Sequence, residues 1–229
     1  GWGRERGGGE LGGAPRQRLG DALRGFARLF TLPHTWGILA LGAVTYAAFV
    51  SLRGLWLGPM LVDRHGFSLV AAGNVAVALT VLALVGPPLF GRFDPGAARR
   101  RRILVFTLVL VGFFALMAVG TGPVVDVAAS LVLSLLSGFI VLQYSDVRSS
   151  YPPETVGRAL SLFTMAMFLG VALMQWLTGV VASAAAAAGW PIYGAVFAAI
   201  AVLLALGAVA FAWLPQPQRE SDTGGTRNS

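Results

Sequence analysis

Arg53 stands inside a long apolar stretch of the sequence, where a charged side chain is uncommon. An arginine at the centre of a membrane costs ~2.5 to 3.5 kcal/mol on insertion scales, and such residues tend to be functional. Asn74 and Gln175 lie at similar depth in two other apolar stretches, and Tyr46 is a further cavity candidate or a core residue. Together they predict a polar pocket for an anionic or carboxylated solute. The alternative is that Arg53 extends its guanidinium to the headgroups near Trp56.

A second group of charged residues lies in the connections between the apolar stretches. Asp146, Arg148 and Arg158 surround the fourth connection, and Arg92 begins the second. We expect the first three to cluster as an ion-pair gate that depends on the state of the protein, with Arg92 as an anchor at the same surface. Ordinary topology-determining charges explain these residues equally well.

Catalytic and metal-binding signatures are missing from the sequence. The chain has no cysteine, no HExxH motif, no glycine-rich phosphate loop with lysine and no GxSxG motif. His34 and His65 lie outside the apolar stretches and are expected at the membrane interface rather than in a metal site. Asp126 is expected to be a solvated turn residue, with proton coupling as the alternative if it turned inward. We therefore predict no enzyme activity, no catalytic residue, no metal and no cofactor.

These side chains lie in or between six apolar runs. The length of each run is close to the ~20 residues that a helix needs to cross a bilayer. The chain is 56% hydrophobic and 12% charged, with a mean hydropathy of +0.73. Period-two alternation, which marks membrane barrels, is absent from the runs. The sequence therefore predicts an all-α membrane protein with six transmembrane helices. The runs are Thr35–Leu57, Ser68–Phe90, Ile103–Gly120, Pro123–Tyr144, Ala159–Ala182 and Trp190–Leu214.

The fourth run carries small residues at helical spacing. Ser130, Ser134, Ser137 and Gly138 recur three or four positions apart or adjoin that series. Small residues on one face of a membrane helix let a second backbone approach closely. We therefore expect another helix to pack tightly against this face.

The net charge of +7 comes from seventeen arginines and follows the order of the runs. Fifteen of these arginines lie before the first run, in the second or fourth connection, or after the last run. Arginines beside membrane helices normally stay on the cytoplasmic side. The sequence thus predicts a multi-pass protein of the bacterial inner (plasma) membrane with both termini in the cytoplasm, and no nucleic-acid partner.

The two flanks differ in composition from the runs. Residues 1–34 are expected to be a cytoplasmic basic linker with a short interfacial helix, and residues 215–229 a cytoplasmic tail around the bundle at 35–214. Leu19, Leu23, Phe26 and Phe30 recur at helical spacing in this linker. The alternative is a cytoplasmic extension of the first span. Because the chain begins with Gly1, we expect an incomplete chain.

Three stretches carry a resemblance to a known family. LRGFARLFTLPHTWGILALG (Leu23–Gly42) resembles the cytoplasmic segment before the seventh helix of major facilitator superfamily (MFS) transporters. SLRGLWLGPMLVDRHGFS (Ser51–Ser68) resembles that seventh helix with its outer loop. GRFDPGAARRRR (Gly91–Arg102) is similar to the repeated basic loop of the family, although Gly91 replaces the usual aspartate and Asp94 is out of register.

This resemblance implies the carboxyl-terminal half of an MFS transporter, with six of twelve helices, alternating access and a solute site near the midplane. It also implies a proton or solute gradient as the energy source, and pairing with a second six-helix half or a second copy. We therefore predict a permease for a small solute in the lipid bilayer. The rival hypothesis is a six-helix scaffold or assembly partner that transports nothing. Convergence of Arg53, Asn74 and Gln175 on one cavity would favour transport.

Overall fold

The computed structural model describes residues 19–92 and 96–214, with the side chains of all these residues except 19–23 and 97. Within this part six helical segments are long and apolar enough to cross a membrane, which confirms the predicted all-α fold with six spans. The predicted features before residue 19, at Asp94 and at 215–229 lie outside the described residues. The α-helices are α1 (Leu19–Phe30), α2 (Pro33–Ser51), α3 (Leu57–Pro59), α4 (Leu69–Gly91), α5 (Arg99–Val119), α6 (Pro123–Leu136), α7 (Ile140–Ser150), α8 (Pro153–Ala187) and α9 (Ile192–Trp213).

Four short turns of other helical types interrupt or precede these helices. Two π-helical turns, η1 (Leu52–Trp56) and η2 (Met60–Arg64), flank α3, so the first span runs without a break from Pro33 to Arg64. A 3₁₀ turn, η4 (Ser137–Phe139), joins α6 to α7 within the fourth span, and η3 (Gly96–Ala98) precedes α5.

Four spans are longer than the apolar runs that predicted them, and the first and fifth differ most. The first continues past Leu57 and stays helical as far as Arg64, within the stretch Ser51–Ser68 that was expected to include an outer loop. The fifth begins at Pro153 instead of Ala159 and ends at Ala187 instead of Ala182. Proline is favoured in the first turn of a helix, and alanine sustains a helix without apolar bulk. Hydropathy detects the lipid-embedded part of a helix and not its polar or alanine-rich ends.

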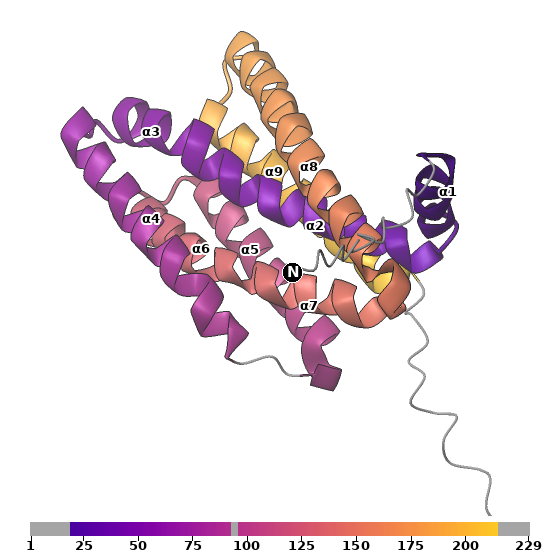
Figure 1. Cartoon of the computed structure of the whole chain (residues 1–229). Coiled ribbons are helices and arrows are strands. Elements are labelled where there is room, and N and C mark those ends of the chain that lie inside the picture. The colour runs from indigo at the N-terminus through magenta and orange to yellow at the C-terminus, as the bar shows by residue number, and fades with distance from the viewer. Residues whose placement is uncertain (1–18, 93–95, 215–229) are drawn as a thin grey trace, which may run out of the picture.

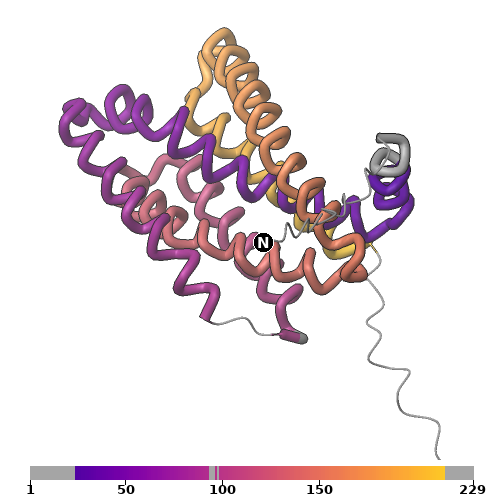
Figure 2. The backbone as a smooth tube through the Cα atoms, in the orientation of Figure 1, coloured from indigo at the N-terminus to yellow at the C-terminus, as the bar shows by residue number. Residues whose placement is uncertain are grey.

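The spans form two neighbouring groups that share one bundle (Figure 1). α2 packs against α8 and α9, α9 also packs against α5, and α4 packs against α6. Figure 2 shows the connections alternating between the two ends, with α1 beside the α7–α8 turn and the α8–α9 turn at the opposite end. With six spans, this alternation places the start of the first span and the end of the last at the same end of the bundle.

α4 and η4 approach each other closely. Gly86 and Gly138 face each other there, and a Cβ on either would overlap the other residue's backbone. Ser134 donates a hydrogen bond to the backbone carbonyl of Leu79, about two turns closer to the start of α4 than Gly86. The predicted close packing against the small residues of the fourth run is therefore confirmed.

Burial is uneven among the spans. In the most apolar stretch of each span, 50% of the residues are buried in the first span, against 17% in α4 and 17% in α8. The exposed side chains of α4 and α8 are mostly large and apolar, among them Leu84, Val81, Phe168 and Trp176. These surfaces suit lipid or a second helical bundle, and the first span forms the centre of this one.

Candidate functional site

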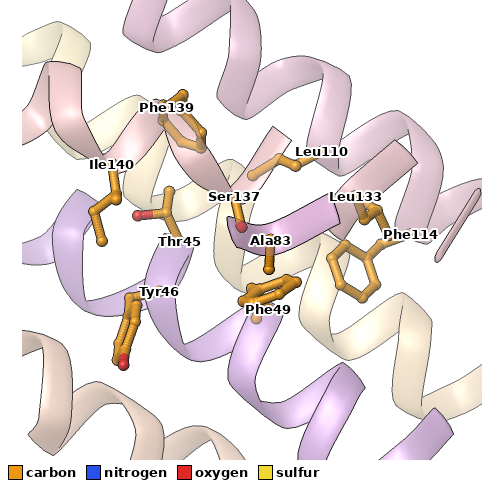
Figure 3. Close-up of a pocket in the computed structure, with 11 residues that line it drawn as sticks. Thr45, Tyr46, Phe49, Ala83, Leu110, Phe114, Leu133, Ser137, Phe139 and Ile140 are labelled. Carbon is orange, nitrogen blue, oxygen red and sulfur yellow. The ribbon is translucent and has the colours of Figure 1, made fainter. Parts of the chain in front are cut away.

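A cavity of about 140 Å³ opens between the first span and the fourth span. Figure 3 shows side chains converging on it from α2, α4, α5 and the α6–α7 junction. α2 contributes residues that share one helical face, because positions three and four apart lie together. The lining residues are Thr45, Tyr46, Ala48, Phe49, Ala83, Leu110, Phe114, Leu133, Ser137, Phe139 and Ile140.

Apart from the Tyr46 hydroxyl, the few polar side chains in this wall are hydrogen-bonded within the protein. Thr45 donates to the carbonyl of Leu41 at 2.9 Å, and the Gln143 amide donates to the Thr45 hydroxyl at 3.0 Å. Ser137 donates to the carbonyl of Ser134 at 2.7 Å. Among the described residues the Tyr46 hydroxyl has no hydrogen-bond partner. The wall is therefore mostly apolar, and Tyr46 supplies its available polar group.

From Tyr46 in the cavity wall, the first span continues through Phe49 to Arg53. The Tyr46 ring meets Phe168 of α8 edge-on at 5.8 Å. The Arg53 guanidinium lies 5.7 Å from the ring centroid of Phe49, which is a cavity residue. Arg53 is exposed and Tyr46 half-buried. The arginine is thus one turn beyond the cavity wall, with its charge in an open position.

The two amides of the predicted pocket lie on other helices. Asn74 is exposed on α4, and Gln175 is half-buried on α8. Neither belongs to the cavity wall, and nor does Arg53; of the four predicted binding residues, Tyr46 lines it. A shared pocket of Arg53, Asn74 and Gln175 stays a prediction.

Arg53 lies in the π-helical turn η1, which the sequence pattern did not predict. π turns are rare and occur frequently at functional sites. Pro59 follows in α3, and a proline inside a helix removes one backbone donor and crowds the carbonyl four residues earlier. Gly54, Gly58 and Pro59 were the available signal for an irregular helix here. The wider turns change the direction in which Arg53 points relative to a regular helix.

Asp146 of the predicted gate is buried and lies 3.8 Å from the guanidinium of Arg100 on α5. Arg100 also covers the ring of Phe211 at 4.1 Å and donates to the Phe211 carbonyl at 3.3 Å. Arg100 was predicted only as a topology-determining charge, and its pairing with Asp146 was not predicted. Its signal was weak, because Arg99 to Arg102 are consecutive and point in four directions around the helix.

The three arginines of the predicted gate lie elsewhere at the same end. Arg92 and Arg148 are exposed, and Arg158 is half-buried. The Arg158 guanidinium lies against Gly25 of α1, where a Cβ would overlap it. The structure thus shows an ion pair of Asp146 with Arg100, and gating by the predicted residues stays a prediction.

Asp126 contradicts its sequence expectation. It is not a solvated turn residue, since its exposed fraction is 0%. His65 lies 2.8 Å and Arg64 3.3 Å from the same carboxylate oxygen. Pro123 starts α6, so Asp126 falls in the first turn, where the helix dipole favours a negative charge. The end of η2 brings both basic side chains over that turn.

The geometry fits a membrane bundle with an apolar cavity, and the sequence comparison gives its family. The chain matches the Major Facilitator Superfamily over residues 39–228, and it therefore belongs to this family. No curated protein matches the chain. Membership implies a multi-pass secondary transporter that moves a small solute across a lipid bilayer, and proteins of this family are generally not enzymes.

Proposed function

We propose that the chain is the carboxyl-terminal half of a twelve-helix transporter that moves a small anionic solute by alternating access. A second six-helix half, or a second copy of the chain, completes the cavity opposite the first span. Tyr46 and Arg53 contact the solute, and Asn74 and Gln175 meet it from α4 and α8 in the assembled protein. The observation that carries this proposal is the open position of Arg53 one turn from the cavity wall.

Two features support the second half. α4 and α8 flank the first span and present large apolar side chains outward. A cationic side chain on an exposed face of a membrane span is costly in lipid, and it is stabilised where a water-filled cavity covers it. A second bundle across α4 and α8 would provide that cavity.

Uptake into vesicles by the full-length protein tests the role of Arg53. We expect the variant Arg53→Gln to lose roughly 10- to 100-fold in uptake of an anionic solute, because a hydrogen bond to a charged group contributes about 1.5 to 3 kcal/mol. Arg53→Lys should retain part of the activity. Measurements with and without a proton gradient identify the energy source.

Arg102→Gln is the matched control, since it removes the same charge from an exposed position on α5. It should leave uptake unchanged. If Arg53→Gln transports every solute of a broad panel at the normal rate, Arg53 does not bind the substrate. Failure of the unaltered protein to move any solute would favour the scaffold instead.

The proposed topology places both termini, the basic segment 1–34 and the tail 215–229 in the cytoplasm of a bacterium. The chain has no cysteine, so single introduced cysteines can be labelled without background. Thr121 and Ala98 are exposed and lie in successive connections. A membrane-impermeant thiol reagent should label Thr121→Cys from outside intact cells and Ala98→Cys after permeabilisation. Labelling of both from the same side would contradict the topology.

The proposed inner gate comprises Asp146, Arg148, Arg158 and Arg92, with Arg100 as the partner of the buried carboxylate. Alternating access needs contacts at this end that form in one state and break in the other. The exposed Arg92 and Arg148 are available to a facing bundle. Crosslinking of cysteines at these two positions to the second half, with and without solute, would test whether their surroundings change.

A further inference from the structure

A second, larger cavity is separate from the apolar cavity of the first span, and it shares Arg158 with the proposed inner gate. It has a volume of about 560 Å³ and opens where α1 and the α1–α2 turn meet the α7–α8 turn and the start of α8. Figure 1 shows α1 beside this end of the bundle, where it packs against α8 and α2. The lining residues are Arg24, Gly25, Arg28, Leu29, Thr31, Leu32, Tyr151, Pro152, Thr155 and Arg158.

The walls of this basic cavity carry three arginines from two elements. Arg24 and Arg28 are four residues apart and therefore share one face of α1, while Arg158 approaches from α8. Arg28 and Arg158 make no ion pair with any acidic side chain in the part of the chain that the structure describes. Among the lining residues whose side chains the structure describes, there is no aspartate or glutamate. The cavity thus offers guanidinium donors to an anion.

Local packing holds one of these guanidinium groups in place. Arg158 is half-buried, and its guanidinium lies directly against the backbone of Gly25, which has no side chain to displace it. The neighbouring hydroxyls are already committed as donors: Thr31 to the carbonyl of Arg28 at 2.7 Å and Thr155 to the carbonyl of Pro152 at 3.0 Å. Guanidinium groups therefore dominate recognition, and they suit phosphate because they donate two hydrogen bonds side by side.

The surroundings place this cavity at the surface of the membrane. Trp36, at the start of the first span, is 54% exposed and its indole N–H donates to the Phe30 carbonyl at 3.0 Å. The exposed ring of Phe30 lies 5.4 Å from the Trp36 ring. Tryptophan is enriched where hydrocarbon meets headgroups, so the arginines beside this aromatic pair lie at headgroup level.

We propose that the basic cavity binds the phosphate headgroup of an anionic phospholipid, with Arg28 and Arg158 as the principal contacts. The acyl chains extend past Phe30 and Trp36 into the bilayer, and the lipid fastens α1 to α8. The phosphate chemistry alone would also accept free inorganic phosphate. The aromatic pair favours the lipid because it marks the membrane interface beside Thr31 and Leu32, which line the cavity.

Lipid-dependent thermal stability of the full chain tests this site. The purified protein is reconstituted in phosphatidylcholine alone and in phosphatidylcholine mixed with phosphatidylglycerol, and inorganic phosphate is added separately. We expect phosphatidylglycerol to raise the unfolding temperature. In the variant R28Q/R158Q its apparent affinity should fall at least about tenfold, since one arginine near an anionic surface contributes roughly fivefold. Retention of phosphatidylglycerol on the protein in native mass spectrometry gives a second readout.

The double variant R101Q/R102Q is the matched control. It removes the same charge from exposed positions at the same end of the bundle, and it should bind phosphatidylglycerol normally. Equal losses in the two double variants would mean a diffuse surface potential and overturn the site. Equal stabilisation by phosphatidylcholine, or by inorganic phosphate, would overturn the anionic lipid. If R28Q/R158Q does not fold, R28Q alone decides, because Arg28 is exposed.

Discussion

At one end of the bundle a buried aspartate pairs with two basic side chains, whereas the opposite end exposes most of its arginines. We call the first the paired end (Asp63, Arg64, His65, Asp126 and Tyr193) and the second the arginine end (Arg28, Arg92, Arg99 to Arg102, Arg148 and Arg158). At the paired end Asp126 is fully buried, and the Tyr193 hydroxyl donates to Asp63 at 2.9 Å. At the arginine end Arg28, Arg92, Arg101, Arg102 and Arg148 are all exposed.

The paired end connects four spans of the same bundle. Arg64 reaches Asp126 of α6 and also donates to the Met117 carbonyl of α5 at 3.2 Å. Gly120 makes room for it, with a φ of +81° and no Cβ to meet the guanidinium. Asp63 adds the contact to α9. Because these contacts stay within six helices, they favour movement of the bundle as one rigid body, as rocking-type alternating access requires.

The largest effect is expected from Asp126→Asn at the paired end. Loss of the buried charge leaves Arg64 and His65 without their anion, and breaking a buried ion pair costs about 3 kcal/mol or more. The unfolding temperature of the detergent-solubilised protein measures this loss. Asp63→Asn is the control, since Asp63 is exposed and should change stability far less. Equal effects of the two variants would show that the buried pair does not stabilise this end.

A smaller effect is expected from Arg100→Gln at the arginine end. Arg100 is the partner of the buried Asp146 and also covers Phe211. We expect a loss of about 1.5 to 3 kcal/mol, the range for a hydrogen bond that involves a charged group, because the Arg100 guanidinium also donates to the Phe211 carbonyl. Arg101→Gln, one residue further along α5 and exposed, should change stability little. If Arg101→Gln lowers the stability by as much, the arginines of this end act through their summed charge. The contrast between the paired end and the arginine end would then fail.

The sequence predicted the number of spans correctly, but it did not predict where the first and fifth spans begin and end. Lipid requires about twenty apolar residues for each crossing, and this requirement is visible in composition. It does not constrain Met60–Arg64 or Pro153–Gly157, which are helical outside the apolar runs. Pro153 was a usable signal for a helix start. No comparable sequence pattern predicts the π turn at Arg53. The nearby glycines and proline indicate an irregular helix, but they do not specify its type.

The sequence shows which residues are charged, but it did not predict which of them pair. Pro123 at the start of α6 could have placed Asp126 in a first turn, but burial depends on how η2 folds over that turn. The four consecutive arginines imply that one faces the core, since successive helical residues point about 100° apart. The rotation of α5 decides that this one is Arg100. Tyr46, left open as a cavity candidate or a core residue, lines the cavity, and its contact with a solute stays a prediction.

The smallest effect is expected from Tyr151→Phe, beside the buried pair of the arginine end. The Tyr151 and Thr35 hydroxyls lie 2.8 Å apart, and one such bond contributes about 0.5 to 1.5 kcal/mol. Burial, the main cause, and the Asp146 charge raise the pKa of Tyr151 above its usual value of 10.0, against the opposing effects of Thr35 and Arg100. The fold therefore favours the neutral phenol.

The sign of the pH effect follows from this pKa. Above pH ~10 the unfolded chain releases the phenol proton first, so the contribution of Tyr151 to stability is complete below that pH and declines as the pH rises through the folded value. The unfolding temperature of Tyr151→Phe should therefore fall less than that of the unaltered protein between about pH 8 and pH 11. Tyr46→Phe is the control, because its hydroxyl has no partner among the described residues. Identical pH profiles for Tyr151→Phe and the unaltered protein would mean that the phenol is not buried as the structure has it.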